Sequence, residues 1–291
     1  MKNRKSTLYV VGFVLAFMVA ATAADAPRLN FKFTTVEVPG AIQTSVQGVD
    51  NAGVMVGSYQ EKSLAVHGFM LNNKKLTTID DPKGTVTVCR NINFKGTAIV
   101  GYYVNSAQAL VGFLYKSGKF TDIPGPTGAL SAAAFGINDK GEIVGYFQDP
   151  NYVAHGFVLK GTTYTTLDPH RSINTLANGI NNEGNIVLAW DWKNCSACSS
   201  LYNGKTYKLI NVPGAAGSAV ADLNNAGDVV YTWQDSRNKL HGALLHGGKY
   251  YKFDFPKAVQ TFPHGINDRH VIVGEYQLPS GLWQGFKATY K

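Results

Sequence analysis

A short hydrophobic–polar pair recurs six times along the chain, at intervals of 43 to 45 residues. Each pair stands directly before a predicted turn, and most of these turns contain Asn and Gly. A period of this length is typical of repeat arrays or closed rings of equivalent units. The six pairs are Val49-Asp50, Ile92-Asn93, Ile137-Asn138, Ile180-Asn181, Leu223-Asn224 and Ile266-Asn267.

One repeat shows how the unit is built. Between residues 128 and 169 the pattern predicts four short strands, at 132–137, 142–147, 154–159 and 164–167. Turns containing Gly141 and Gly161 separate the first strand from the second and the third from the fourth. Four short strands repeated at this spacing indicate one blade of a propeller. The sequence therefore predicts an all-β fold, a six-bladed β-propeller of four-stranded blades.

The two ends of the chain predict how the ring closes. The last repeat stops after its third strand, at 285–290, whereas a spare fourth strand at 33–38 precedes the first repeat. Pairing the N-terminal strand with the last blade would complete that blade and remove an exposed sheet edge. The expected domains are a signal peptide at 1–23, a linker at 24–32 and a six-repeat propeller at 33–291. An open superhelix of the same units is the alternative.

The N-terminus has the pattern of a signal peptide. Lys2, Arg4 and Lys5 precede an apolar run at 8–21 and a small-residue cleavage site at 21–23. An uncleaved anchor is the competing interpretation. We expect an extracellular or periplasmic protein with no membrane span after cleavage. Removing these three cations lowers the formal net charge from +8 to +5. Without a run of Lys and Arg, nucleic acid is not expected as a partner.

Cysteine use is sparse. Cys195 and Cys198 form a Cys-x-x-Cys pair without the βαβ context of a redox motif or a second ligand pair for zinc. A local disulfide or two free thiols are both compatible with export. Cys89 falls in a predicted inner strand, where it should be a buried small residue.

The repeat resembles the HAF-repeat proteins, predicted extracellular bacterial proteins named for a His-Ala-Phe-like triplet. The resemblance covers nearly the whole mature chain and includes the Ile-Asn-x-x-Gly-x-Ile-Val-Gly pattern at 137–145. The fourth repeat departs most, with Cys198-Ser199-Ser200 at the triplet. The resemblance implies export and a repeat fold but no common activity. The other triplets are His67-Gly68-Phe69, Val111-Gly112-Phe113, His155-Gly156-Phe157, His241-Gly242-Ala243 and Gln284-Gly285-Phe286.

Two repeated features invite a metal interpretation. The Asn/Gly turns offer one or two carboxylates each, too few for a calcium loop, so we interpret them as ordinary turns. His67, His155 and His241 fall in three different blades, too far apart to share one metal ion. Each is expected to be a packed or hydrogen-bonded strand residue. We therefore expect no metal site and no cofactor.

The end of the second strand is aromatic in all six repeats. Such rings could fill the gap between neighbouring blades or could stack on a sugar ring. Repeats four and five favour binding locally, because Trp190, Asp191 and Trp192, and then Trp233 and Asp235, combine apolar faces with hydrogen-bonding groups. Tyr276 and Tyr59 complete the candidate binding set. The six aromatic positions are Tyr59, Tyr103, Phe147, Trp190, Trp233 and Tyr276.

A second candidate site lies on the innermost strand. The position three residues before the polar member of each pair is polar in four of the repeats. These residues are Gln47, Arg90, Asn178 and His264. If this position points inward, these side chains line the central channel with polar groups. Neighbouring glycines would allow close approach at a crowded axis.

Three functions remain open from the sequence. The favoured one is a secreted, monomeric, non-catalytic propeller that recognises a glycan or an extracellular protein. The first alternative is a polysaccharide hydrolase or lyase, which would need two facing carboxylates. Its candidates are the loop aspartates at 80, 81, 149, 168, 191 and 235. The second alternative is a structural protein of the envelope or matrix. No nucleophile elbow, zinc-protease motif or phosphate loop identifies catalytic residues.

Overall fold

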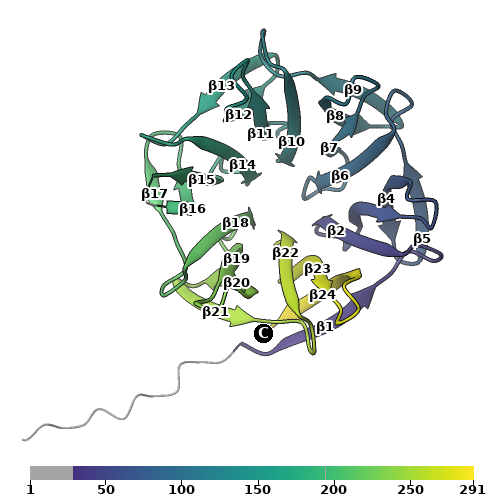
Figure 1. Cartoon of the computed structure of the whole chain (residues 1–291), viewed down its shortest axis with the longest axis vertical. Helices are drawn as coiled ribbons and strands as arrows, with labels where there is room; N and C mark the ends of the chain where they lie inside the picture. Colours follow the sequence, from purple (N-terminus) through teal and green to yellow (C-terminus); the bar gives the residue numbers. More distant parts are fainter. Residues whose placement is uncertain (1–28, 194) are drawn as a thin grey trace, which may run out of the picture.

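The computed structural model describes residues 29–193 and 195–291. These residues form 24 strands arranged as a ring of six blades around a central axis (Figure 1). The predicted signal peptide at 1–23 and most of the predicted linker lie outside the described residues. Among the described residues, no helix has the length and apolar character needed to cross a membrane.

Each of the first five blades uses four consecutive strands, the first nearest the axis. A single parallel pairing, Val66 with Val86, joins the sheets of blades 1 and 2. Blade 1 comprises β2 (Gln43–Val49), β3 (Met55–Gln60), β4 (Val66–Asn72) and β5 (Lys75–Ile79). Blade 2 comprises β6 (Val86–Ile92), β7 (Ile99–Val104), β8 (Leu110–Lys116) and β9 (Lys119–Ile123). Blade 3 comprises β10 (Ser131–Ile137), β11 (Ile143–Gln148), β12 (Ala154–Lys160) and β13 (Thr163–Leu167).

The remaining blades follow the same plan, with a shortened outer strand in blade 4. Blade 4 comprises β14 (Asn174–Ile180), β15 (Ile186–Trp192), β16 (Cys195–Tyr202) and β17 (Tyr207–Leu209). Blade 5 comprises β18 (Gly217–Leu223), β19 (Val229–Gln234), β20 (Leu240–His246) and β21 (Lys249–Phe253). Blade 6 comprises β22 (Gln260–Ile266), β23 (Val271–Gln277), β24 (Trp283–Tyr290) and, from the other end of the chain, β1 (Phe31–Val36). The predicted fold class is confirmed.

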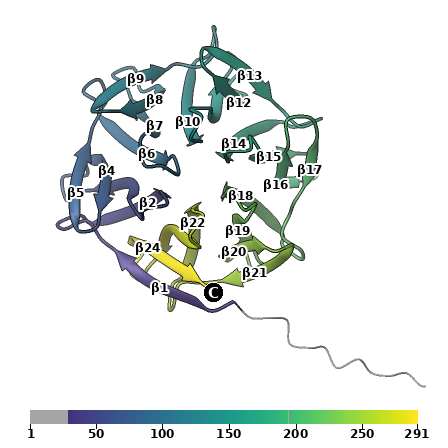
Figure 2. The same cartoon turned by 180° about the vertical axis from the view of Figure 1, so that it is seen from behind.

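The ring closes as the sequence predicts. β1 pairs antiparallel with β24, from Phe31 opposite Tyr290 to Val36 opposite Gly285, and the C-terminus lies beside β1 (Figures 1 and 2). The closing strand begins at residue 31 rather than 33, because Phe31 also packs on Phe253 with ring centroids 4.8 Å apart. The propeller therefore begins two residues earlier than the predicted boundary.

The recurring asparagine of the hydrophobic–polar pair connects neighbouring blades. The side-chain amide of Asn138 donates to the carbonyl of Asn181 at 3.0 Å, and Asn181 donates to the carbonyl of Asn224 at 3.3 Å. In the same way, the side-chain amide of Asn224 donates to the carbonyl of Asn267. The side-chain amide of Asn267 donates to the carbonyl of Asp50 at 2.7 Å, which completes the series around the ring. These buried bonds satisfy groups that would otherwise be costly to leave unpaired. The anchor is thus an inter-blade contact as well as a turn residue.

The core between blades is filled by complementary volumes. In four blades a glycine of the second strand faces a buried phenylalanine of the third, as Gly57 faces Phe69. A Cβ added to Gly57 would lie 2.0 Å from the carbonyl oxygen of Ser45. Blades 4 and 5 place a large residue in the second strand and a small one opposite. These pairs are Leu188 with Ser200 and Tyr231 with Ala243, and they explain why repeat four departs from the triplet pattern.

The outer strand of blade 4 is shorter than its equivalents, since strand geometry ends at Leu209. The chain nevertheless stays bonded to β16, because the backbone N–H of Ile210 donates to the carbonyl of Ser199 at 2.9 Å. Asn211 accepts a hydrogen bond from the backbone N–H of Ser199 at 2.7 Å, as Asp80 accepts one from Gly68 in blade 1. Ile210 and Val212 are buried in the core.

Candidate functional site

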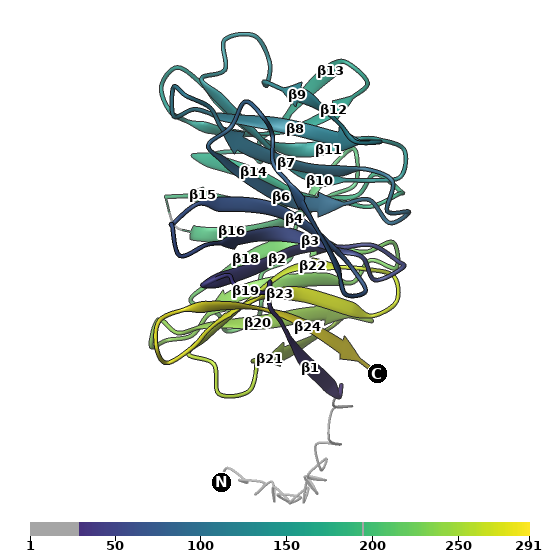
Figure 3. The same ribbon diagram turned by 90° about the vertical axis from the view of Figure 1, so that its right-hand side faces the viewer.

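Strand polarity gives the disc two different faces, seen edge-on in Figure 3. The first strand of each blade begins, and the second strand ends, on the same side, as the pairing of Gln43 with Gln60 shows. We call this side the upper face. It carries the loops between second and third strands and the loops between blades. The Asn/Gly turns lie on the opposite, lower face.

All six recurring aromatic residues lie at the upper end of their second strands, but they differ in exposure. Trp233 is only 9% exposed and donates its indole N–H to the carbonyl of Gly242 at 3.1 Å. Lys252 covers its ring, with Nζ 3.7 Å from the centroid. Tyr276 is 4% exposed and stacks on Phe255 at 3.7 Å. These two rings are packed into the structure and present little surface to a ligand.

The three triplet histidines form a repeated cluster in alternate blades. His155 stacks on Phe147, and its Nδ1 lies 2.7 Å from Asp168 while Nε2 lies 3.7 Å from Asp149. His67 has the same relation to Tyr59, Asp80 and Glu61, and His241 has it to Trp233, Asp254 and Asp235. The histidines are therefore hydrogen-bonded strand residues, as expected. Sequence reasoning missed the fixed spacing of their carboxylates, 13 residues after and six residues before each histidine.

These contacts occupy most of the loop aspartates that could have formed a catalytic pair. Asp80, Asp149, Asp168 and Asp235 each contact a histidine of their own blade. The backbone N–H of Lys239 is the main group holding the pKa of Asp235 below its usual value. In the parts of the chain that the structure describes, no three His, Cys, Asp or Glu side chains are grouped to hold a metal ion.

Blade 4 gathers the other part of the predicted binding set. Trp190, Asp191 and Trp192 end β15 at the upper face, where all three side chains are half-buried. Trp190 and Asp191 line a hollow of about 230 Å³ together with Asn174. Asp191 accepts hydrogen bonds from the backbone and side chain of Asn174, at 2.7 and 3.2 Å, which fix its carboxylate. Trp192 lines an adjoining hollow of about 410 Å³, whose lining also includes Asn211, Val212 and Gly217.

The two hollows adjoin at Ala197, which lines both, and we refer to them together as the cleft between blades 4 and 5. Cys195 and Cys198 are joined by a disulfide beside this cleft, and their Cα atoms lie 5.8 Å apart. Cys198 lies opposite Trp190 and Cys195 lies opposite Trp192, so the bridge ties the strand that supports both indoles. Cys89 is a free, fully buried thiol, as predicted.

The predicted channel residues share one backbone feature. Each is the extra residue of a β-bulge in an inner strand, since the pairing of β2 with β3 skips Gln47 and the other five inner strands skip the equivalent position. A bulge re-aims a side chain and often lies beside a functional site. Arg90 donates through Nη1 to Gln47 of the neighbouring blade and lies over the ring of Phe135. Asn178 donates to the carbonyl of Val220 at 2.7 Å, and His264 contacts Glu275 at 3.2 Å.

The residues directly after the bulge residues lie at the crowded centre of the ring. Gly48, Gly136, Gly179 and Gly265 pack so closely that an added Cβ would meet a neighbouring blade within about 3 Å. Asn91 of blade 2 and Asp222 of blade 5 hold the remaining positions and contact one another at 3.4 Å. Burial raises the pKa of Asp222 to about 7, although N–H groups of Leu223, Ile266 and Asn91 oppose the shift. The glycine expectation is confirmed.

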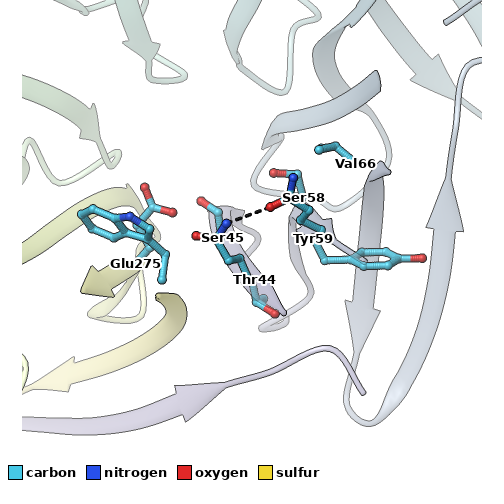
Figure 4. Close-up of a pocket in the computed structure, with 9 residues that line it drawn as sticks. Thr44, Ser45, Ser58, Tyr59, Val66 and Glu275 are labelled. Carbon is cyan, nitrogen blue, oxygen red and sulfur yellow. Dashed lines mark hydrogen bonds between the residues drawn. The ribbon is translucent and has the colours of Figure 1, made fainter. Parts of the chain in front are cut away.

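Sequence reasoning missed a third hollow, between blades 6 and 1. Its volume is about 230 Å³, and its lining includes Ser45, Ser58, Glu275 and Trp283. Figure 4 shows Glu275 on one side, Ser58 and Tyr59 on the other, and Thr44 and Ser45 between them. A comparison of equivalent repeat positions could have found it, because Glu275 and Trp283 stand where the other repeats hold different residues.

The fold and its site define the chain as a six-bladed β-propeller with inter-blade hollows on its upper face. No protein-family model matches the sequence, and no curated protein matches it either. Solved structures share the fold at low sequence identity. A putative TolB from Agrobacterium tumefaciens has a TM-score of 0.61 and 11% identity, with 91% of this chain and 98% of that chain covered.

Two further proteins also share the architecture. The lectin of Aleuria aurantia, described as a six-bladed β-propeller with a novel mode of fucose recognition, has a TM-score of 0.53 and 15% identity over 87% of this chain and 93% of that chain. AofleA from Arthrobotrys oligospora has a TM-score of 0.53 and 10% identity over 89% and 82%. At these identities the similarity establishes the fold.

Proposed function

We propose that this chain is an exported, monomeric recognition protein of the HAF-repeat type that binds a glycan on its upper face. The observation that carries the proposal is the cleft between blades 4 and 5. Its walls bring together Trp190, Trp192 and the fixed carboxylate of Asp191. Sugar recognition needs this combination, because a pyranose has apolar C–H faces and a rim of hydroxyl groups.

The contrast with blade 5 supports this assignment. Trp233 is enclosed by His241 and Lys252, whereas the blade 4 indoles lack a histidine partner because Cys198 occupies the triplet position. The indole N–H of Trp190 donates to Ser200 at 2.9 Å, which fixes the orientation of the ring. A fixed aromatic wall reduces the entropy lost when a ligand binds. Among known folds, propellers that recognise fucose share this architecture.

The test is a glycan array probed with the mature protein, the Trp192→Ala variant and the Trp233→Ala variant. We expect the parent protein to bind glycans on the array and Trp192→Ala to lose binding to at least one of them. Trp233→Ala, to the extent that it folds, should retain the same glycan specificity. Circular dichroism and thermal melting establish folding of each variant. A blank array for the parent, or binding unaffected by Trp192→Ala, contradicts a glycan site in this cleft.

A protein partner is the second candidate, because the same face carries exposed apolar residues at its loop tips. Tyr152 is 73% exposed and Ile173, beside the blade 4 cleft, is 53% exposed. Exposed apolar groups gathered on one face indicate an interaction surface. Photo-crosslinking from position 152 in cells that express the protein would yield one defined adduct if a protein docks there. Ile173→Ser should reduce that adduct.

A further inference from the structure

The hollow between blades 6 and 1 lies at the junction where the ring is closed. Gln43, Thr44 and Ser45 of the first inner strand form one part of its lining, and Glu275 and Trp283 of blade 6 form another. A smaller hollow of about 140 Å³ adjoins it, and its lining includes Glu37 and Gln284. Both open on the upper face. Trp283 is part of the lining of both hollows.

The junction between blades 6 and 1 differs from the other inter-blade junctions at two equivalent positions of the repeat. The residue before the recurring aromatic is a carboxylate only in blade 6, as Glu275. The residue directly before the triplet is an indole only there, as Trp283. The equivalent residues elsewhere are Ser58, Tyr102, Tyr146, Ala189 and Thr232 for the first position, and Val66, Leu110, Ala154, Ala197 and Leu240 for the second.

Folding of the blade does not require these two residues, since five other blades form with smaller or uncharged ones. Placing a carboxylate in a half-buried hollow is moreover costly unless it is hydrogen-bonded. Glu275 keeps 23% of its side chain exposed, and His264 donates to it at 3.2 Å. Burial opposes ionisation, but His264 and Ser45 outweigh it and hold the pKa of Glu275 below its usual value. The chain thus maintains a charged acceptor at the base of an open hollow.

A polar network fixes the orientation of this acceptor. Gln47 donates to Ser45, and Arg90 donates to Gln47, so the bulge residues of blades 1 and 2 support the wall of the hollow from the axis. On the same blade 1 side of the hollow, Gln43 donates to Gln60 at 2.8 Å. Trp283 packs edge-on against Phe262, at 5.2 Å and 76°, which restricts the orientation of the indole. Binding groups that are fixed before the ligand arrives favour affinity.

We propose that this hollow is a second carbohydrate site, which takes a single neutral sugar ring against Trp283 with its hydroxyl groups donating to Glu275. The volume is below the roughly 300 Å³ at which pockets for drug-sized ligands begin, and therefore suits one ring rather than a long segment. The site shares its class of ligand with the proposed function but none of the residues of the blade 4 cleft. Two separated sites on one face would allow a branched or surface-bound glycan to bind with avidity.

The test is calorimetric titration with the methyl glycosides of fucose, galactose, mannose and glucose. The proteins compared are the parent, Trp283→Ala, Glu275→Gln and, as the control from the other cleft, Trp192→Ala. We expect at least one glycoside to bind the parent. Its affinity should fall about tenfold or more in both Trp283→Ala and Glu275→Gln, the scale of one lost charge-assisted hydrogen bond. Trp192→Ala should leave one binding event per molecule at this site.

Glu275→Gln preserves the shape of the side chain and guards against misfolding as the cause of any loss. Thermal melting of this variant should stay close to that of the parent. Retention of parent affinity in either Trp283→Ala or Glu275→Gln overturns the inference. Loss of all binding in Trp192→Ala alone also overturns it, but leaves the proposed function standing. If no glycoside binds the parent and the glycan array is blank, both proposals fail.

Discussion

The carboxyl group of Asp222 gives the protein a stability that depends on pH. Asp222 is 5% exposed at the crowded axis, where it accepts hydrogen bonds from the backbone of Ile266 at 3.3 Å and from Asn91 at 3.4 Å. Burial raises its pKa from 3.8 to about 7. The perturbation that tests this is Asp222→Asn, which keeps the size of the side chain and removes its ionisation.

The sign of the effect follows from the direction of the shift. Between the two pKa values the folded protein keeps the Asp222 proton, whereas the unfolded chain has released it. The stabilisation is therefore complete below a pH of 3.8 and is lost as the pH rises through about 7. Since one pKa unit corresponds to about 1.4 kcal/mol, a shift of roughly three units changes the free energy of unfolding by about 4 kcal/mol over that range.

The assay is urea unfolding of the parent and Asp222→Asn at several values from about pH 5 to about pH 8. Other groups titrate as well, so the informative quantity is the stability of the variant minus that of the parent. We expect this difference to rise by about 1.4 kcal/mol per pH unit and to level off near pH 7. Glu183→Gln, which alters an exposed carboxylate of a lower-face turn, should show a flat difference. A flat difference for Asp222→Asn would refute the reasoning.

Three further outcomes test the ring. Deleting residues 31–36 should cause aggregation or a lower melting temperature, because β24 loses its partner and becomes an exposed edge; thermal neutrality would mean that closure does not stabilise the fold. Asn267→Ala should lower the free energy of unfolding by about 1–3 kcal/mol in urea titrations, because the carbonyl of Asp50 loses its donor. Trp233→Ala should cost about 3–5 kcal/mol in the same assay, the scale of emptying a packed indole site; a loss within the error of the titration would show that the ring is not packed.

Local repetition made much of the fold predictable. The 43-residue period, the strand–turn pattern and the spare N-terminal strand predict the six blades and the pairing of β1 with β24. Small errors arose where side chains extend or end a strand. Phe31 lengthens β1 because it packs on Phe253, and β17 ends at Leu209 although Ile210 remains bonded to Ser199.

The sites were only partly predictable, because a repeat gives equivalent positions the same expected role. Trp190 and Trp233 are equivalent in sequence, yet Trp233 is covered by Lys252 whereas Trp190 lines a cleft. Their difference depends on side chains from other strands. The pairing of each triplet histidine with two carboxylates likewise depends on strand register, although its regular spacing was visible in the sequence.

The sequence by itself determined the period, the alternation along each strand and the residues available to each blade. These are local properties, set by backbone preferences and side-chain polarity within about 43 residues. Only the tertiary structure decided that Glu275 and Trp283 meet Ser45, a residue 230 positions before Glu275 in the chain. The physical reason is closure: pairing of the first strand with the last blade brings the two ends of the sequence to one junction, and local patterns do not encode contacts across it.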